Sequence, residues 1–189
     1  RDIVSVNIYD PKSGTNDYST FDHHFTAEEA TQVLEKLAAL QLNGTKVVTH
    51  NGLGFDFKVL GEVSGNQELA GRVAVMSFDI QTNLMEGANY RFSSRGISVE
   101  NLAVELKVGE KTEQAVFAYL LWMRANNQTV ELSHLDNLSP ENLKGQTAEE
   151  IVSELNSTSV ADAKKRLKDY TIGDTHLTAG TFQALHGTR

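Results

Sequence analysis

The sequence predicts an α/β domain in which helices flank one mixed β-sheet, and two observations support this class. The chain opens with a hairpin pattern: residues 3–10 alternate apolar and polar side chains like a strand with one buried face, and residues 18–25 can form the returning strand. A turn and short apolar strand at 43–50, a helical pattern at 53–63 and an apolar strand at 72–80 follow. Strand, helix and strand in that order imply a parallel pair with a right-handed crossover. Antiparallel and parallel strands together make the sheet mixed.

Four further segments carry helical signals. In residues 26–41, Thr26 and Glu29 have the spacing of a capping box, and apolar side chains recur along one face of the helix. The last helix is long, although Gly173 and Gly180 weaken it by about 1 kcal/mol each. The last helix is expected at 160–185. The two remaining helical segments are expected at 97–107, with Ser98 as N-cap, and at 113–126.

Length and composition are those of one ordinary globular domain. The 189 residues are 40% hydrophobic and contain no cysteine, which excludes disulfides and thiolate metal sites. No apolar run approaches the roughly 20 residues that a membrane span needs, and no signal-peptide pattern opens the chain, so we expect a cytoplasmic protein without a membrane partner. Residues 128–159 are polar around a second capping signal, and we expect them to form an insertion in a single domain, 1–189.

The formal net charge of −8 lowers the expectation of a protein that coats nucleic acid, because such proteins usually carry a basic excess. The charge does not exclude an enzyme that acts on nucleic acid. A site built from carboxylates around divalent cations is itself negative until the cations bind.

Asp56 is a lone carboxylate in the stretch "THNGLGFDFKVL", where a short apolar strand leads into a helix. A carboxylate in the first turns of a helix gains roughly 0.3 to 1 kcal/mol from the helix dipole, so helix stabilisation explains Asp56 taken alone. By the same reasoning Asn51 belongs to a turn dipeptide, and His50 caps the strand. The alternative is a catalytic role for the carboxylate.

Tyr170 and Asp174 are four residues apart in the last helix, so their Cβ atoms lie about 5 to 6 Å apart on one face. A phenol and a carboxylate in this arrangement can hold a water molecule between them, or the carboxylate can bind a metal ion while the hydroxyl orients its water. The simpler interpretation is an exposed pair on a solvated face of the helix.

Taken together, these stretches resemble the DEDD-type 3′-to-5′ exonucleases of the ribonuclease H-like superfamily. In "HNGLGFD", Asn51, Phe55 and Asp56 match the second motif of that family. In "YTIGD", Tyr170 and Asp174 match the third motif of its Tyr-bearing (DEDDy) subgroup. The resemblance covers most of the chain and fades around residues 128–159. It implies a ribonuclease H-like sheet and hydrolysis of phosphodiester bonds in single-stranded nucleic acid, with DNA expected over RNA, alone or beside a polymerase or replication partner.

The resemblance also implies two Mg²⁺ or Mn²⁺ ions and a role for each matched residue. Asp174 would be a direct metal ligand, Asp56 would act on the second ion directly or through water, and Tyr170 would position the attacking water. Hard cations of this kind prefer carboxylate oxygens. The expected contacts to the substrate come from the second-motif loop and from a polar loop with basic and aromatic side chains, "NYRFSSR": His50, Asn51, Phe55, Arg91 and Arg95.

The chain departs from the family at the first motif, because no Asp is followed two residues later by Glu anywhere in it. Residues 1–14 resemble the second strand of the family with its hairpin turn. We therefore expect the first strand to lie upstream, leaving a gap in the sheet between the hairpin and the parallel pair. The metal site would then be incomplete, and these residues alone would have weak or no catalytic activity.

Two other interpretations stay open. The same fold can serve as a non-catalytic module that binds nucleic acid or a protein. The motif matches can also be accidental in an unrelated α/β domain, in which case Asp56 and Asp174 would lie far apart. The family places no metal ligand at Asp79, so that carboxylate is expected to be structural.

Overall fold

The computed structural model of the chain describes residues 2–88, 96–110, 115–136, 143 and 145–187. It is a mixed α/β structure with two small sheets, each of two strands. The first sheet is an antiparallel hairpin and the second a parallel pair, as the sequence predicts. Their strands are β1 (Ser5–Asp10) and β2 (Thr15–Thr20), then β3 (Val48–Thr49) and β4 (Phe78–Asp79).

The two sheets are not joined by hydrogen bonds between their strands in the part of the chain described, so the predicted single mixed sheet is divided in two. The six residues of β1 are half-buried or exposed. Beneath its apolar face lies an open pocket of about 160 Å³, whose walls include Val6, Ile8, Phe25 and Val33. The apolar face of β1 is therefore only partly covered.

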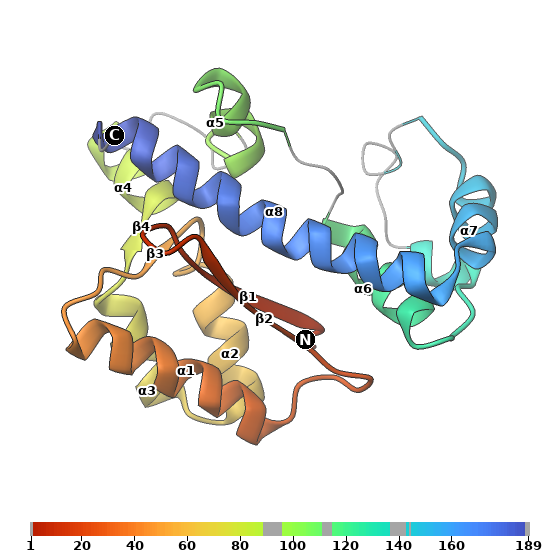
Figure 1. Cartoon of the computed structure of the whole chain (residues 1–189), viewed down its shortest axis with the longest axis horizontal. Helices are drawn as coiled ribbons and strands as arrows, with labels where there is room; N and C mark the ends of the chain where they lie inside the picture. The colour runs from red at the N-terminus through yellow and green to blue at the C-terminus, as the bar shows by residue number, and fades with distance from the viewer. Residues whose placement is uncertain (1, 89–95, 111–114, 137–142, 144, 188–189) are drawn as a thin grey trace.

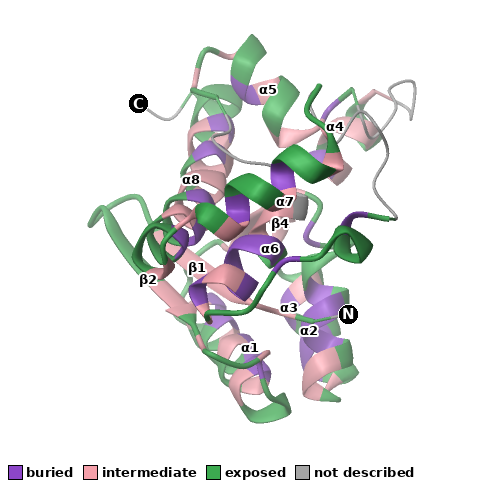
Figure 2. Cartoon of the chain, turned by 90° about the vertical axis from the view of Figure 1, so that its right-hand side faces the viewer, coloured by how far each residue is buried: buried purple, intermediate pink, exposed green. Residues whose placement is uncertain are grey.

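Helices cover both faces of the sheets (Figure 1). Three of them lie on one side and share one hydrophobic core, to which Leu34, Phe57 and Val73 contribute fully packed side chains; Figure 2 shows buried residues on these helices. One long helix crosses the other side and contacts both β1 and β3. The three helices on the first side are α1 (Ala27–Leu42), α2 (Asp56–Ser64) and α3 (Gln67–Val75), and the long helix is α8 (Val160–His186).

The capping signals in the sequence are confirmed. Thr26 and Glu29 form both bonds of the capping box at the start of α1. Ser98 accepts the N–H of Asn101 at the start of α5 (Val99–Glu105). Thr147 and Glu150 form a second capping box. The helices expected at 113–126 and around 147–155 are α6 (Ala115–Ala125) and α7 (Ala148–Ser157).

The strand predicted at 72–80 is wrong for most of its length. Asn66 accepts the N–H of Leu69 and starts α3, and the strand that remains is β4. Residues 69, 70 and 73 are buried at helical spacing, so packing against α1 and α2 selects the helix although valines favour a strand. The hairpin also differs from prediction, because Gly14, at φ +69°, closes the turn early and β2 begins at Thr15.

The long terminal helix is continuous, and Gly180 has a packing reason. A Cβ atom at this position would lie 2.3 Å from a methyl group of Val108, so the close approach of α8 to the residues after α5 requires glycine. Each described helix is too short or too polar to cross a bilayer.

The described part of segment 128–159 packs against α6 and α8 around a second hydrophobic core, although its composition is polar. Its buried side chains include Val130, Leu135, Ile151 and Leu155, and it contains the 3-10 helix η1 (Leu132–Leu135). Arg124 of α6 donates hydrogen bonds to the carbonyl oxygens of residues 128, 155 and 158 and so fastens the segment at both ends. In Figure 1, α6 and α7 lie at one end of α8, away from α1–α3.

Candidate active site

Two glycines lie in the tight loop before Asp56, the first residue of α2. A Cβ atom at Gly52 would lie 2.6 Å from the Thr49 side chain, and one at Gly54 would lie 2.4 Å from Asn51 Oδ1. The Thr49 contact involves Cβ itself and cannot be relieved by a rotation, so Gly52 keeps the loop against the end of β3, whereas the exposed Asn51 amide can turn away from Gly54. Sequence reasoning missed this role of Gly52, and the signal for it was a glycine three residues after the end of the strand.

Asp79 ties the same loop to the parallel strands. It is 1% exposed, and its Oδ2 accepts the Thr49 hydroxyl at 3.0 Å and the Leu53 N–H at 3.3 Å. Its Oδ1 accepts the Thr82 N–H at 2.8 Å and caps α4 (Ile80–Gly87). Burial acts to raise the pKa of Asp79, but these hydrogen bonds outweigh it and the pKa is lowered. Asp79 is structural, as the sequence predicts.

Tyr170 and Asp174 lie on the inward side of α8. Tyr170 is 9% exposed and Asp174 is half-buried. The side chains at 163, 167, 177 and 181, at helical spacing from them, are buried as well. The structure therefore rules out the simpler interpretation that the pair lies on a solvated face.

The fold brings Asp56 close enough to Asp174 and Tyr170 for their charges to interact. Burial, the negative charge of Asp79 and then that of Asp174 raise the pKa of Asp56 to about 6. The pKa of Tyr170 is raised by burial, by the charge of Asp174, by a hydrogen bond to that carboxylate and by Asp56. We call these four residues the acidic centre. Asp56 and Asp174 therefore do not lie far apart in space.

Asp56 is surrounded by protein and still reached by water. Its residue surface is exposed, yet neighbouring protein atoms are dense enough to disfavour its ionised form. A carboxylate that water reaches from one side combines these two properties. Such a group can bind a ligand from solvent without a rearrangement of the core.

The remaining predicted site residues fall into three places. His50 is half-buried, and its Nε2 lies 2.8 Å from the Ile97 carbonyl oxygen, so it anchors the chain before α5. Asn51 is exposed at φ +61°, and its carbonyl accepts the Phe55 N–H. Phe55 is 51% exposed beside Leu53 at 40%. Arg91 and Arg95 lie outside the described residues.

The donors of the acidic centre suit a hard cation. Asp56 and Asp174 offer carboxylate oxygens and a net negative charge, and Mg²⁺ commonly binds one or two protein carboxylates together with water and phosphate. Among the residues the structure describes, no group of three or more His, Asp or Glu side chains is arranged to hold a metal ion. The two carboxylates thus fit part of a metal site.

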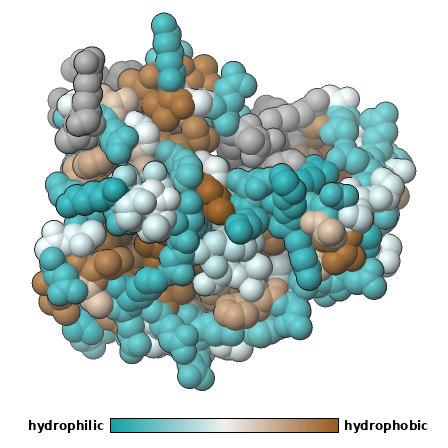
Figure 3. Space-filling model, in the orientation of Figure 1, coloured by the Kyte–Doolittle hydropathy of each residue, from teal (hydrophilic) through white to brown (hydrophobic). Residues whose placement is uncertain are grey.

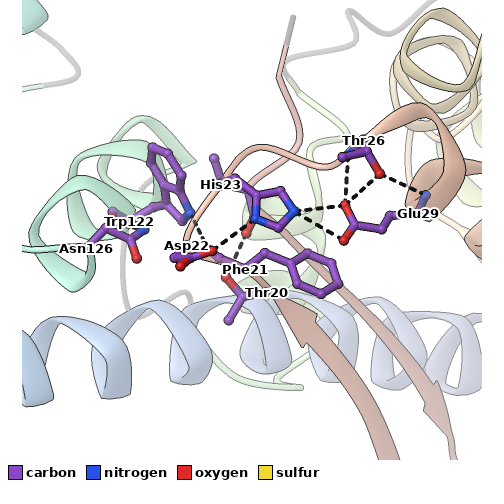
Figure 4. Close-up of polar contacts among 9 residues, drawn as sticks. Thr20, Phe21, Asp22, His23, Thr26, Glu29, Trp122 and Asn126 are labelled. Carbon is purple, nitrogen blue, oxygen red and sulfur yellow. Dashed lines mark hydrogen bonds and ion pairs between the residues drawn. The ribbon is translucent and has the colours of Figure 1, made fainter.

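A second set of ionisable side chains lies at the start of α1, and we call Asp22, His23, Thr26 and Glu29 the histidine cluster (Figure 4). His23 Nδ1 lies 3.0 Å from Asp22, and Nε2 lies 3.2 Å from Glu29. Hydrogen bonds to Asp22 and then Glu29 raise the pKa of His23. The pKa of Asp22 is lowered chiefly by His23, and that of Glu29 chiefly by the Thr26 N–H. Opposite charges compensate one another here.

Comparisons with protein-family models, with curated proteins and with solved structures find no match to the chain.

Proposed function

We propose that the acidic centre belongs to a metal-dependent 3′-to-5′ exonuclease of ribonuclease H-like fold and the Tyr-bearing DEDD type. One observation carries the proposal: α8 buries Tyr170 beside Asp174 on its inward side, and the fold brings Asp56 of α2 within electrostatic reach of this pair, although α2 and α8 lie far apart in the sequence. Like charges held together in a water-accessible place are costly unless a cation or a proton joins them. A divalent cation is the partner that nuclease chemistry requires.

Each residue of the centre has a distinct part in this proposal. Asp174 and Asp56 would hold Mg²⁺ or Mn²⁺, which when bound lowers the pKa of water and offsets the charge of a phosphate. The Tyr170 hydroxyl, which forms a hydrogen bond with Asp174, would orient a water molecule beside that carboxylate. Asp79 keeps the loop before Asp56 in place.

We propose single-stranded nucleic acid as the substrate, DNA over RNA, and a polymerase or replication protein as the partner. Phe55 directly precedes Asp56 and Leu53 lies three residues before it, and their exposed side chains offer apolar area against which unpaired bases can pack. His50 lies before this loop in the sequence and contacts the Ile97 carbonyl oxygen. Phe55 is therefore the residue we assign to the terminal bases of the substrate.

We further propose that an extended segment completes the site between β1 and β3. The sheets are separate, α8 contacts both of them, and the apolar face of β1 is only half-covered. In the family that the chain resembles, the strand in this position carries the Asp-x-Glu motif, which would add carboxylates to those of Asp56 and Asp174. Without such a strand, Asp56 and Asp174 alone would hold Mg²⁺ or Mn²⁺ weakly, so the 189 residues alone should cleave slowly or not at all.

The test is an exonuclease assay on end-labelled single-stranded DNA with Mg²⁺ or Mn²⁺. It compares the 189 residues with a longer chain that includes whatever residues its gene encodes before Arg1. In the active form, Asp174→Asn and Asp56→Asn should each reduce the rate at least about 100-fold, because the loss of even an outer partner of a metal ligand costs 10- to 100-fold. Tyr170→Phe should also reduce it, by a smaller factor.

Asp169→Asn is the matched control, because Asp169 lies on the same helix, is exposed and pairs with Lys165. Its rate should equal that of the unchanged protein. Equal rates in the Asp174, Asp56 and Asp169 variants would overturn the proposed roles.

A non-catalytic nucleic-acid-binding module is the second candidate, and the exposed Phe55 and Leu53 support it independently of metal chemistry. In that case the longer chain would bind single-stranded DNA without cleaving it. Binding would weaken in Phe55→Ala and would stay unchanged in Asp174→Asn.

A further inference from the structure

Three of the most exposed large apolar side chains lie at one end of the helical layer. Leu42 is 81% exposed at the end of α1, Val75 is 86% exposed at the end of α3, and Met76 after it is 55% exposed. The two helix ends are joined, because Gln41 Nε2 donates to the Val73 carbonyl oxygen at 2.9 Å. Figure 3 shows apolar surface toward the edge of the molecule where α1 and α3 lie in Figure 1. An apolar patch of this kind commonly marks an interface.

The patch continues along one face of α3 as a shallow groove. Its lining residues recur at helical spacing and are all exposed: Glu68, Gly71, Arg72, Val75 and Met76. The face thus combines apolar side chains at one end, a glycine in the middle and a pair of opposite charges one helical turn apart.

Neither a close contact within its own chain nor its backbone conformation explains a glycine at position 71. A Cβ atom there would meet nothing within 4 Å, and its φ is not positive. Glycine inside a helix costs roughly 0.5 to 1 kcal/mol relative to alanine. Close approach of a second helix backbone at this point would account for it, because helices come nearest where the side chain between them is smallest.

We infer that α3 pairs in antiparallel fashion with α3 of a second copy of this chain, crossing at Gly71 about a two-fold axis. In such a pair each Glu68 faces the Arg72 of the other copy, so the charge pattern of the helix is complementary to itself. A two-fold contact uses the same surface on both copies, which this self-complementary face satisfies. The exposed apolar side chains at the ends of α1 and α3 are then buried at the two ends of the contact: Leu42, Val75 and Met76.

The test measures the molecular mass of the purified chain by sedimentation equilibrium across protein concentrations from micromolar to millimolar. The unchanged protein should dimerise. Gly71→Leu places a side chain at the crossing point and should weaken dimerisation at least about tenfold, since overfilling a packed contact is destabilising. Circular dichroism should show the same helix content in this variant, because space is open around Gly71 within one copy.

Charge reversal gives a second and independent test. Arg72→Glu sets acidic side chains against each other twice in the dimer and should weaken it at least about tenfold. The swap Glu68→Arg/Arg72→Glu restores the opposite charges and should restore the dimer. Lys12→Glu makes the same change of charge in the exposed hairpin turn and should leave the dimer unaffected.

A protein that stays monomeric at every concentration overturns the inference, and so does a dimer that persists in Gly71→Leu or is not restored by the swap. These readouts do not depend on nuclease activity.

Discussion

Carboxylates gather in both the acidic centre and the histidine cluster, with opposite effects on their pKa values. In the histidine cluster, Glu29 and Asp22 face His23 and backbone donors, and the pKa of each carboxyl is lowered. In the acidic centre, burial and then the negative charges of Asp79 and Asp174 raise the pKa of Asp56 to about 6. The charges of the histidine cluster are balanced within the chain, whereas the acidic centre keeps an excess of negative charge.

This contrast separates a stabilising arrangement from one suited to binding. Opposite charges that pair within the chain stabilise the fold and leave no unpaired charge for a ligand to bind. Charges of one sign oppose the fold and attract a partner of the other sign, and such groups gather at functional sites. Asp79 stands between the two cases, because it lies in the acidic centre but has three hydrogen-bond donors.

The largest expected effect comes from Asp79→Ala. The variant should lose about 2 to 3 kcal/mol of unfolding free energy, because three donors lose a buried acceptor. Urea denaturation at pH 7 measures it. Asp22→Ala is the control, because that side chain is 89% exposed and its removal should leave the urea midpoint almost unchanged. Equal midpoints for the two variants would show that Asp79 does not hold the loop.

The next effect concerns Asp56, whose pKa is about 6 in the folded chain against 3.8 for an ordinary Asp. The folded state therefore binds more protons between these values, and the stability that this group contributes is complete below pH 3.8 and lost as the pH rises through about 6. Asp56→Asn should be more stable than the unchanged protein at pH 7.5, by about 0.5 to 1 kcal/mol after solvent screening.

Thermal or urea denaturation between pH 3.5 and pH 8, compared with Asp169→Asn, measures this difference. A stability gain that is the same at every pH would contradict the raised pKa, and a loss at pH 7.5 would show that Asp56 is compensated within the chain.

The smallest expected effect on stability is that of protonating His23, because this side chain is exposed. Its pKa is raised by Asp22 and Glu29, so its contribution to stability is present below about pH 6.5 and is lost as the pH rises through the higher folded value. NMR titration of the His23 ring should give a pKa above that of an unstructured histidine, and Glu29→Gln should bring it down. A His23 pKa unchanged by Glu29→Gln would remove the contrast between the two regions.

Local signals in the sequence predicted the ends of helices well. The capping boxes at Thr26 and Thr147 and the N-cap at Ser98 form as expected, because each needs only a side chain and a backbone N–H two or three residues away. The segment 72–80 failed for the opposite reason. Valines and a short apolar run fit a strand or a buried helix, and only packing against α1 and α2 selects the helix.

The candidate site, too, was predictable from the sequence only in part. The spacing of Tyr170 and Asp174 placed them on one helix face, but the sequence did not say whether that face was buried. The packing of Gly52 against Thr49 was not predicted either, because the sequence shows only a glycine in a turn. Both features depend on residues distant in the chain or on backbone geometry that composition does not encode.

By itself, the sequence determined the residue types available for chemistry, the helix starts and the order of hairpin and parallel unit, since these depend on neighbours along the chain. Only the tertiary structure decided that Asp174 lies within electrostatic reach of Asp56, that the sheets remain separate and that one face of α3 is left open. The physical reason is that burial and charge interactions depend on distance in space, and the packing of α8 across the sheets sets those distances.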